Sequence, residues 1–108
     1  MQDPMAALEL NYITIQDQVN MLSLNCDPTE RNVLNTRLVA ARSAYWSCVN
    51  KAFHDDDPQV VALTAQLKQQ TQAIEDVVQD MGDLAKVLDQ ITKAVNTATK
   101  LAALVISA

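Results

Sequence analysis

The strongest constraint on how this chain folds is an apolar repeat that occupies its last half. Stepping alternately three and four residues from Val60 to Val105, thirteen of fourteen positions are apolar, and Gln70 is the exception. A strict seven-residue repeat places these side chains on one face of an α-helix and favours left-handed supercoiling against a partner helix. The repeat keeps its phase past Gly82, so the spacing predicts one continuous helix over residues 58–106.

The residues beside this stripe indicate what kind of partner the helix has. Two-stranded zippers usually carry Glu or Lys at the flanking positions. Here almost none of those positions are charged, and most are apolar from Ala73 onward. A face widened in this way is typical of a helix in a bundle of three or more. A buried polar residue in the seam can set the register between helices, and Gln70 is the candidate for that role.

The dipeptide Asp-Pro occurs three times and marks the start of three predicted helices. It stands at residues 3–4, 27–28 and 57–58, each time before a helical apolar pattern. Asp accepts hydrogen bonds from the free N–H groups of a first turn, and Pro at the first helical position loses no hydrogen bond. Together with the apolar spacing, this predicts helices over about residues 5–24 and 28–54 ahead of the long helix.

Both shorter helices have an apolar face. In the first helix this face consists of Leu8, Tyr12, Ile15, Val19 and Leu22. In the second helix one stripe consists of Leu34, Leu38, Ala41, Tyr45, Cys48 and Ala52, and a neighbouring stripe consists of Val39, Trp46, Val49 and Phe53. A face this wide suits a helix that touches two neighbours. We therefore interpret Trp46 and Phe53 as core side chains, with a binding platform as the alternative.

These patterns predict an all-α chain. One Gly in 108 residues leaves few positions for the tight turns that β-hairpins need. We expect a single helical domain over residues 1–108, with three helices in an up-down arrangement and a long C-terminal heptad-repeat helix packed as a coiled coil or bundle. If that helix breaks near Gly82, the chain has four helices. Residues 1–4 precede a second Met, and we suspect that they are a cloning remnant, so we assign them no functional role.

The unequal lengths of the predicted helices point to assembly. Two short helices cover only the first half of the long one, and exposing the apolar second half to water is unfavourable. We expect the long helix to stay straight and to bury this half against another chain; folding back near Gly82 is the alternative. The candidate interface residues are Leu84, Leu88, Ile91, Val95, Ala98, Leu101, Ala102 and Val105.

The charge distribution argues against nucleic acid as a partner. The formal net charge of the chain is −5, which repels phosphates. Residues 28–54 carry four cations and one acid, a net of +3. We interpret this basic segment as packing beside acidic neighbours in the same fold, because four spread cations make a poor phosphate-binding strip.

The sequence predicts no catalytic residue, cofactor or metal. His54 beside Asp55–Asp57 is a weak metal signal, because adjacent residues on a turn rarely converge on one ion. Cys48 and His54 lie six residues apart on a predicted helix and do not face each other. A disulfide between Cys26 and Cys48 is not expected across a helix, and two free thiols favour a reducing compartment such as the cytoplasm.

The function predicted from the sequence is therefore that of a non-enzymatic interaction or assembly module, as in an adaptor, chaperone, inhibitor or structural subunit. It would form a homo-oligomer or bind a helical protein through the apolar face of its C-terminal helix, with no small-molecule substrate. A membrane-active protein or pore component is the alternative, resting on the uncharged residues 101–108. The acidic net charge weighs against it, as does the lack of a signal peptide or bilayer-spanning segment. An enzyme with a site shared between subunits has no direct support.

Overall fold

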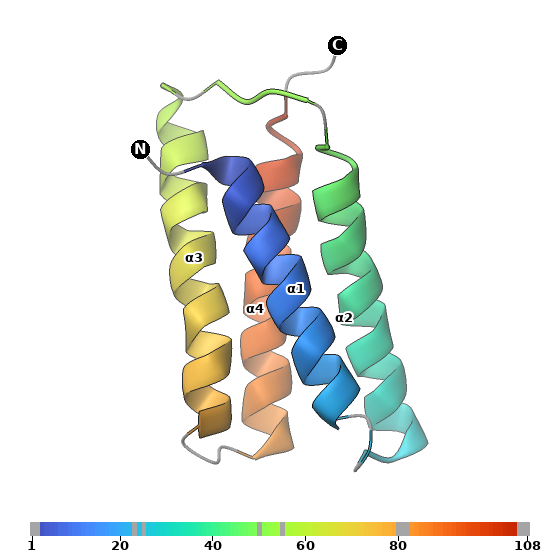
Figure 1. Ribbon diagram of the computed structural model, residues 1–108. Helices are drawn as coiled ribbons and strands as arrows, with labels where there is room; N and C mark the ends of the chain where they lie inside the picture. The colour runs from blue at the N-terminus through green and yellow to red at the C-terminus, as the bar shows by residue number, and fades with distance from the viewer. Residues whose placement is uncertain are drawn as a thin grey trace.

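The computed structural model describes residues 3–22, 24, 26–49, 51–54, 56–79 and 83–105. The helices in this part of the chain are α1 (Pro4–Leu22), α2 (Pro28–Trp46), α3 (Pro58–Gln79) and α4 (Leu84–Ala102). The all-α prediction is confirmed, and the chain has four helices in place of the three that we expected (Figure 1).

The prediction of one straight helix over residues 58–106 is wrong. The chain reverses between Gln79 and Leu84, so that α3 and α4 lie side by side as an antiparallel hairpin (Figure 1). Asp83 starts the new helix, because its backbone is extended and its carboxylate accepts a hydrogen bond from the Lys86 N–H at 2.9 Å. The alternative of four helices therefore describes the fold. Gly82, the residue near which we placed the break, lies outside the described residues.

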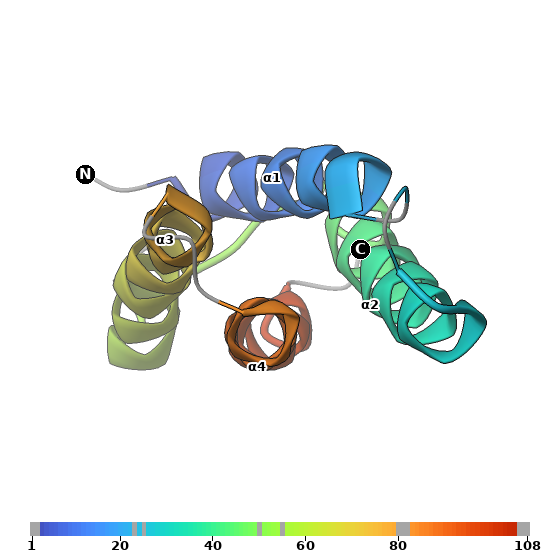
Figure 2. The same ribbon diagram turned by 90° about the horizontal axis from the view of Figure 1, so that it is seen from below.

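The helices form two antiparallel hairpins, α1–α2 and α3–α4, which pack against each other. In Figures 1 and 2, α1 and α3 run in one direction, and α2 and α4 run in the other. Each of α1 and α4 touches both α2 and α3, and α1 and α4 also touch across the shorter diagonal of the bundle. Helices α2 and α3 lie at opposite corners and make no contact with each other.

This arrangement explains why α2 ends at Trp46, well before the predicted end at residue 54. The chain must cross the end of the bundle from the corner of α2 to the corner of α3 (Figure 1). A longer α2 would extend the chain along the α2 axis, at only ~1.5 Å per residue. An irregular segment can instead turn and cross the end of the bundle to α3. Helix α1 also ends slightly early, at Leu22 rather than residue 24.

The three predicted Asp-Pro helix starts are confirmed. Helices α1, α2 and α3 begin at Pro4, Pro28 and Pro58. At each start the preceding Asp accepts a hydrogen bond from a first-turn N–H, at 2.9 Å for Asp3 and Met5, 2.8 Å for Asp27 and Glu30, and 2.8 Å for Asp57 and Gln59. At α2 the Glu30 carboxylate also accepts from the Asp27 N–H at 3.1 Å, which completes a capping box.

The core is built from one apolar face of each helix. Its largest aliphatic side chains are under 2% exposed, and they are Leu8, Ile15, Leu34, Leu67, Ile74, Ile91 and Leu101. Ala94 and Ala98 of α4 are also fully buried, and small side chains let neighbouring helices approach closely. The heptad repeat therefore identified part of the buried face of α3 and α4: Ile91 and Ala98 belong to the repeat, but the buried Val87, Ala94 and Leu101 lie beside it. The partner that covers this face belongs to the same chain.

Polar side chains form hydrogen bonds across the core between α3 and its two neighbours, α4 and α1. The Gln70 side-chain oxygen in α3 accepts a hydrogen bond from the Thr97 hydroxyl in α4, and the Gln70 backbone oxygen accepts one from Gln90 Nε2 at 3.3 Å. Between α1 and α3, Asn11 Nδ2 donates to Thr71 Oγ1 at 3.4 Å. Gln70 thus lies where a register-setting residue belongs, because a slip of α4 along α3 would break both of its bonds.

Truncating a side chain in the centre of this core tests the fold. We expect Ile91→Ala to lower the free energy of unfolding by about 2–5 kcal/mol, because it leaves a cavity in a fully buried site. Val61→Ala on the exposed side of α3 is the control and should change that free energy by no more than about 0.5 kcal/mol. Urea denaturation followed by circular dichroism gives both values, and equal effects would contradict the fold.

Candidate interaction surface

The eight residues predicted as an interface lie on α4 or just after it, and the chain itself covers them. Four are at most 3% exposed, namely Ile91, Val95, Ala98 and Leu101. Four are partly buried, namely Leu84, Leu88, Ala102 and Val105. The bare half of a long helix on which that prediction depended is therefore absent. The buried four reach another protein only if α4 separates from the bundle, so their role as an interface stays a prediction.

The outer side of α1 exposes apolar residues that the sequence interpretation did not single out. Leu10, Ile13 and Met21 are 43–55% exposed, and Leu24, just beyond the end of α1, is 81% exposed. They lie outside the predicted apolar stripe of this helix, whose members Leu8, Ile15 and Val19 are buried. The sequence does contain a signal for this exposure. A helix that faces the core on one side needs a single apolar stripe, and this helix has large aliphatic residues on its opposite side as well.

Helix α2 carries a second exposed apolar site. Val39, Arg42, Ser43 and Trp46 line a shallow hollow of about 530 Å³ on its outer side. The spacing i, i+3, i+4 and i+7 places all four on one helical face. Val39 and Trp46 are 61% and 56% exposed, so the interpretation of Trp46 as a core residue is wrong. Tyr45, its neighbour in sequence, takes the half-buried place against α1 instead.

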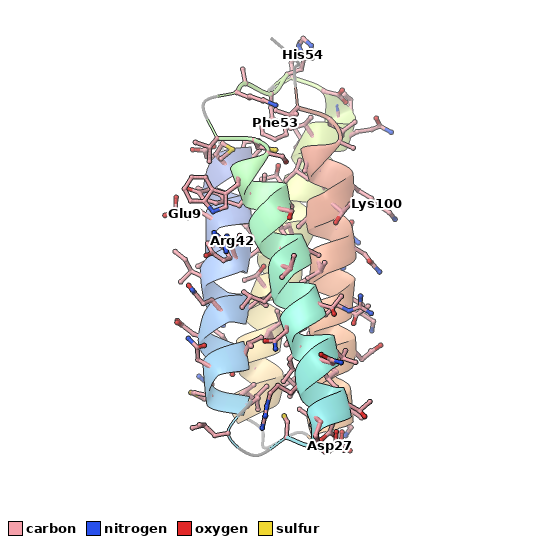
Figure 3. The ribbon with its side chains drawn as sticks, turned by 90° about the vertical axis from the view of Figure 1, so that its right-hand side faces the viewer. Glu9, Asp27, Arg42, Phe53, His54 and Lys100 are labelled. Carbon is pink, nitrogen blue, oxygen red and sulfur yellow. The ribbon has the colours of Figure 1, made fainter. Side chains whose placement is uncertain are left out.

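The interpretation of Phe53 as a core residue agrees with the structure better than that of Trp46. It is partly buried and packs against the core from the segment that crosses the end of the bundle (Figure 3). The sequence treated both aromatics as members of one helical stripe. They separate because α2 ends at Trp46, so that Phe53 reaches the core from a non-helical segment.

Aromatic contacts join α1 to α2 beneath these exposed residues. Tyr12 stacks on Tyr45 with ring centroids 5.9 Å apart, and Tyr45 meets Trp46 edge-on at 5.4 Å. The Tyr45 hydroxyl also donates to the Glu9 carboxylate at 3.5 Å. Such ring contacts add to the stabilisation from burial alone. They orient the Trp46 indole beside the α1–α2 contact, and Glu9 and Arg42 lie on the same side of α2 in Figure 3.

The two helices of this hairpin have opposite charge. Helix α1 contains Glu9 and Asp17 and no cation, a net of −2; helix α2 contains three Arg and one Glu, a net of +2. The sequence interpretation placed the basic segment beside acidic neighbours, and this holds for α1 but not for α4, its other neighbour, which carries three Lys and one Asp, a net of +2. The charges of α1 and α2 are not joined by ion pairs, however, because the one ion pair that the described residues contain links Lys93 to Asp89 within α4.

The groups considered for chemistry are His54 with its acidic neighbours and the two cysteines. The described residues contain no group of three or more His, Cys, Asp and Glu side chains that could hold a metal ion. His54 is exposed at the end of the bundle (Figure 3), and Asp55 lies outside the described residues. Both cysteines are free thiols, and Cys48 is buried. Burial, followed by the nearby Glu30 carboxylate, raises the pKa of the Cys26 thiol, which reduces the reactive thiolate.

The C-terminal residues considered for membrane insertion also pack on the bundle as far as the structure describes them. Leu101 is fully buried, and Leu104 and Val105 are partly buried against the core. Within the described residues, no helix is both long enough and apolar enough to cross a bilayer. Residues 106–108 lie outside the described part of the chain.

Comparison with known proteins adds no relative from which a function can be transferred. No protein-family model matches the chain, and neither the curated proteins nor the solved structures gave a match. The candidate site therefore stands on its own geometry.

Trp46 provides a direct check of this surface. We expect Trp46→Ala to lower the free energy of unfolding by less than about 1 kcal/mol, because more than half of the side chain is already in water. A tryptophan in the core would cost about 3–5 kcal/mol. The protein has one Trp, so quenching of its fluorescence by acrylamide reports the same exposure. A large loss of stability together with protection from quenching would contradict the structure.

Proposed function

We propose that this chain is a non-enzymatic helical interaction module and that its α1–α2 hairpin is the surface that binds another protein chain. One observation carries the proposal: aliphatic and aromatic side chains at Leu10, Ile13, Met21, Leu24, Val39 and Trp46 remain between 43% and 81% exposed on this hairpin. Transferring such side chains from water to an interface is favourable, at ~25 cal/mol per Å² of apolar area.

The outer sides of the other hairpin differ in character. On α3 the exposed positions include Gln59, Gln66, Gln69, Gln72 and Asp76, and on α4 they include Lys86, Asp89, Lys93, Asn96 and Lys100. Among the described residues, Val61 is the large apolar side chain exposed on α3, and α4 has none. Apolar exposure therefore gathers on α1 and α2, which supports a binding role for that side, because isolated surface apolar residues would be scattered.

The kinds of residue on this hairpin also suit protein binding. Trp and Arg are enriched among the residues that dominate interface energies. Trp46 and Arg42 lie one turn apart beside the same hollow, and the stack of Tyr12 on Tyr45 holds the hairpin beneath them. A surface already rigid in the free protein loses less conformational entropy on binding.

This proposal keeps the function predicted from the sequence but changes the surface. Burial of α4 in the same chain removes the need for a second chain to cover it. Binding through α4 would first require its release from the bundle, at a cost in free energy comparable to unfolding. Binding through α1 and α2 requires no such step.

Site-specific photo-crosslinking in the cells that make the protein tests this function. A photo-reactive amino acid at Ile13 should form a discrete protein adduct, because that side chain lies on the proposed surface. The same amino acid at Gln69, on the exposed polar side of α3, is the matched control and should give none. Equal labelling from both positions, or no adduct from Ile13, would contradict the proposal.

A further inference from the structure

We propose that the chain which covers this surface is a second copy of the protein, in a two-fold symmetric dimer where α1 of each copy packs on α2 of the other. The inference rests on the proposed function and adds the identity of the partner. Its basis is the opposite charge of two exposed side chains near the middle of these helices, Asp17 on α1 and Arg42 on α2.

Charge selects this pairing over the other symmetric choices. Packing α1 on its own copy would bring Glu9 and Asp17 of both chains together, with no cation on either helix to offset them. Packing α2 on its own copy would bring the exposed Arg42 side chains together. Like charges that face each other at an interface are strongly unfavourable. Packing α1 on α2 places an acidic and a basic apolar surface in contact at both halves of the dimer.

The relevant side chains are free to pair. Asp17 and Arg42 are both exposed, and neither side chain forms an ion pair or hydrogen bond within the described part of the chain. Arg37, the other cation near the middle of α2, is engaged instead, because its Nε donates to Thr92 Oγ1 of α4 at 3.1 Å. Arg42 is therefore the cation near the middle of α2 whose side chain is available to bind a partner.

The heights of the residues along the hairpin also agree. The stack of Tyr12 on Tyr45 sets the offset between the two antiparallel helices. Asp17 lies five residues after Tyr12 in α1. Because the helices are antiparallel and both rise ~1.5 Å per residue, it is level with the part of α2 five residues before Tyr45, which is the turn that contains Val39 and Arg42. A two-fold axis that runs parallel to the helices, between α1 and α2, preserves height. It therefore places the exposed Asp17 at the same height as the exposed Arg42 of the partner subunit, and it does so twice in each dimer.

Charge-reversal variants test this arrangement by sedimentation equilibrium at low salt. We expect the wild-type protein to dimerise and Asp17→Lys or Arg42→Glu alone to raise the dissociation constant about tenfold, because each reversal creates two repulsive contacts. The double variant should return to within about threefold of wild type, since the pairs are restored with reversed sign. Lys86→Glu, a charge reversal at an exposed position of α4, a helix outside the proposed interface, is the control and should leave the constant unchanged.

The outcomes separate this inference from the proposed function. A wild-type protein that stays monomeric, single reversals without effect in a folded dimer, or a double variant as weak as the single ones would each overturn the second copy as the partner. If the Ile13 adduct then contains a different protein, the interaction function stands without the dimer. If Ile13 gives no adduct at all, both fail. Circular dichroism of every variant confirms that the helices remain folded.

Discussion

The burial of the apolar stripe on residues 84–105 is the interaction on which the rest of the fold depends. This stripe is too long and too apolar to remain in water, and the two preceding helices are too short to cover an extended helix of 49 residues. The chain resolves the conflict by reversing after Gln79 and starting α4 at the Asp83 cap. Ile91, Ala98 and Leu101 are then fully buried within one chain, whereas apolar residues on the outer sides of α1 and α2 remain exposed.

The sequence predicted the helices and their buried faces well because those features are local. Asp-Pro pairs start α1, α2 and α3, and the heptad spacing marked some of the core residues of α3 and α4 but not the buried Val87, Ala94 and Leu101. The reversal before Leu84 escaped prediction because the heptad phase is the same for a straight helix as for a hairpin. The choice between them depends on tertiary packing, which no local pattern records.

The candidate surface was the part least accessible to sequence reasoning. Trp46 was assigned to the core because aromatics at helical spacing usually are, but α2 ends there and Tyr45 occupies the half-buried position against α1. Ile13 and Leu10 were visible as extra apolar residues on α1, yet which side of a helix faces water follows only from the placement of its neighbours. The same packing leaves opposite charges on α1 and α2 without ion pairs between them.

A distance measurement across the α3–α4 hairpin tests the central claim most directly. Spin labels at Gln59→Cys and Lys100→Cys, with Cys26 and Cys48 replaced by Ala, mark two exposed positions that line one hollow in this fold. Pulsed electron resonance should give a separation on the order of 10–20 Å, the spacing of packed helices plus the label arms. A continuous helix would place the two labels about 60 Å apart, at ~1.5 Å per residue, and that result would contradict the closed bundle and everything inferred from it.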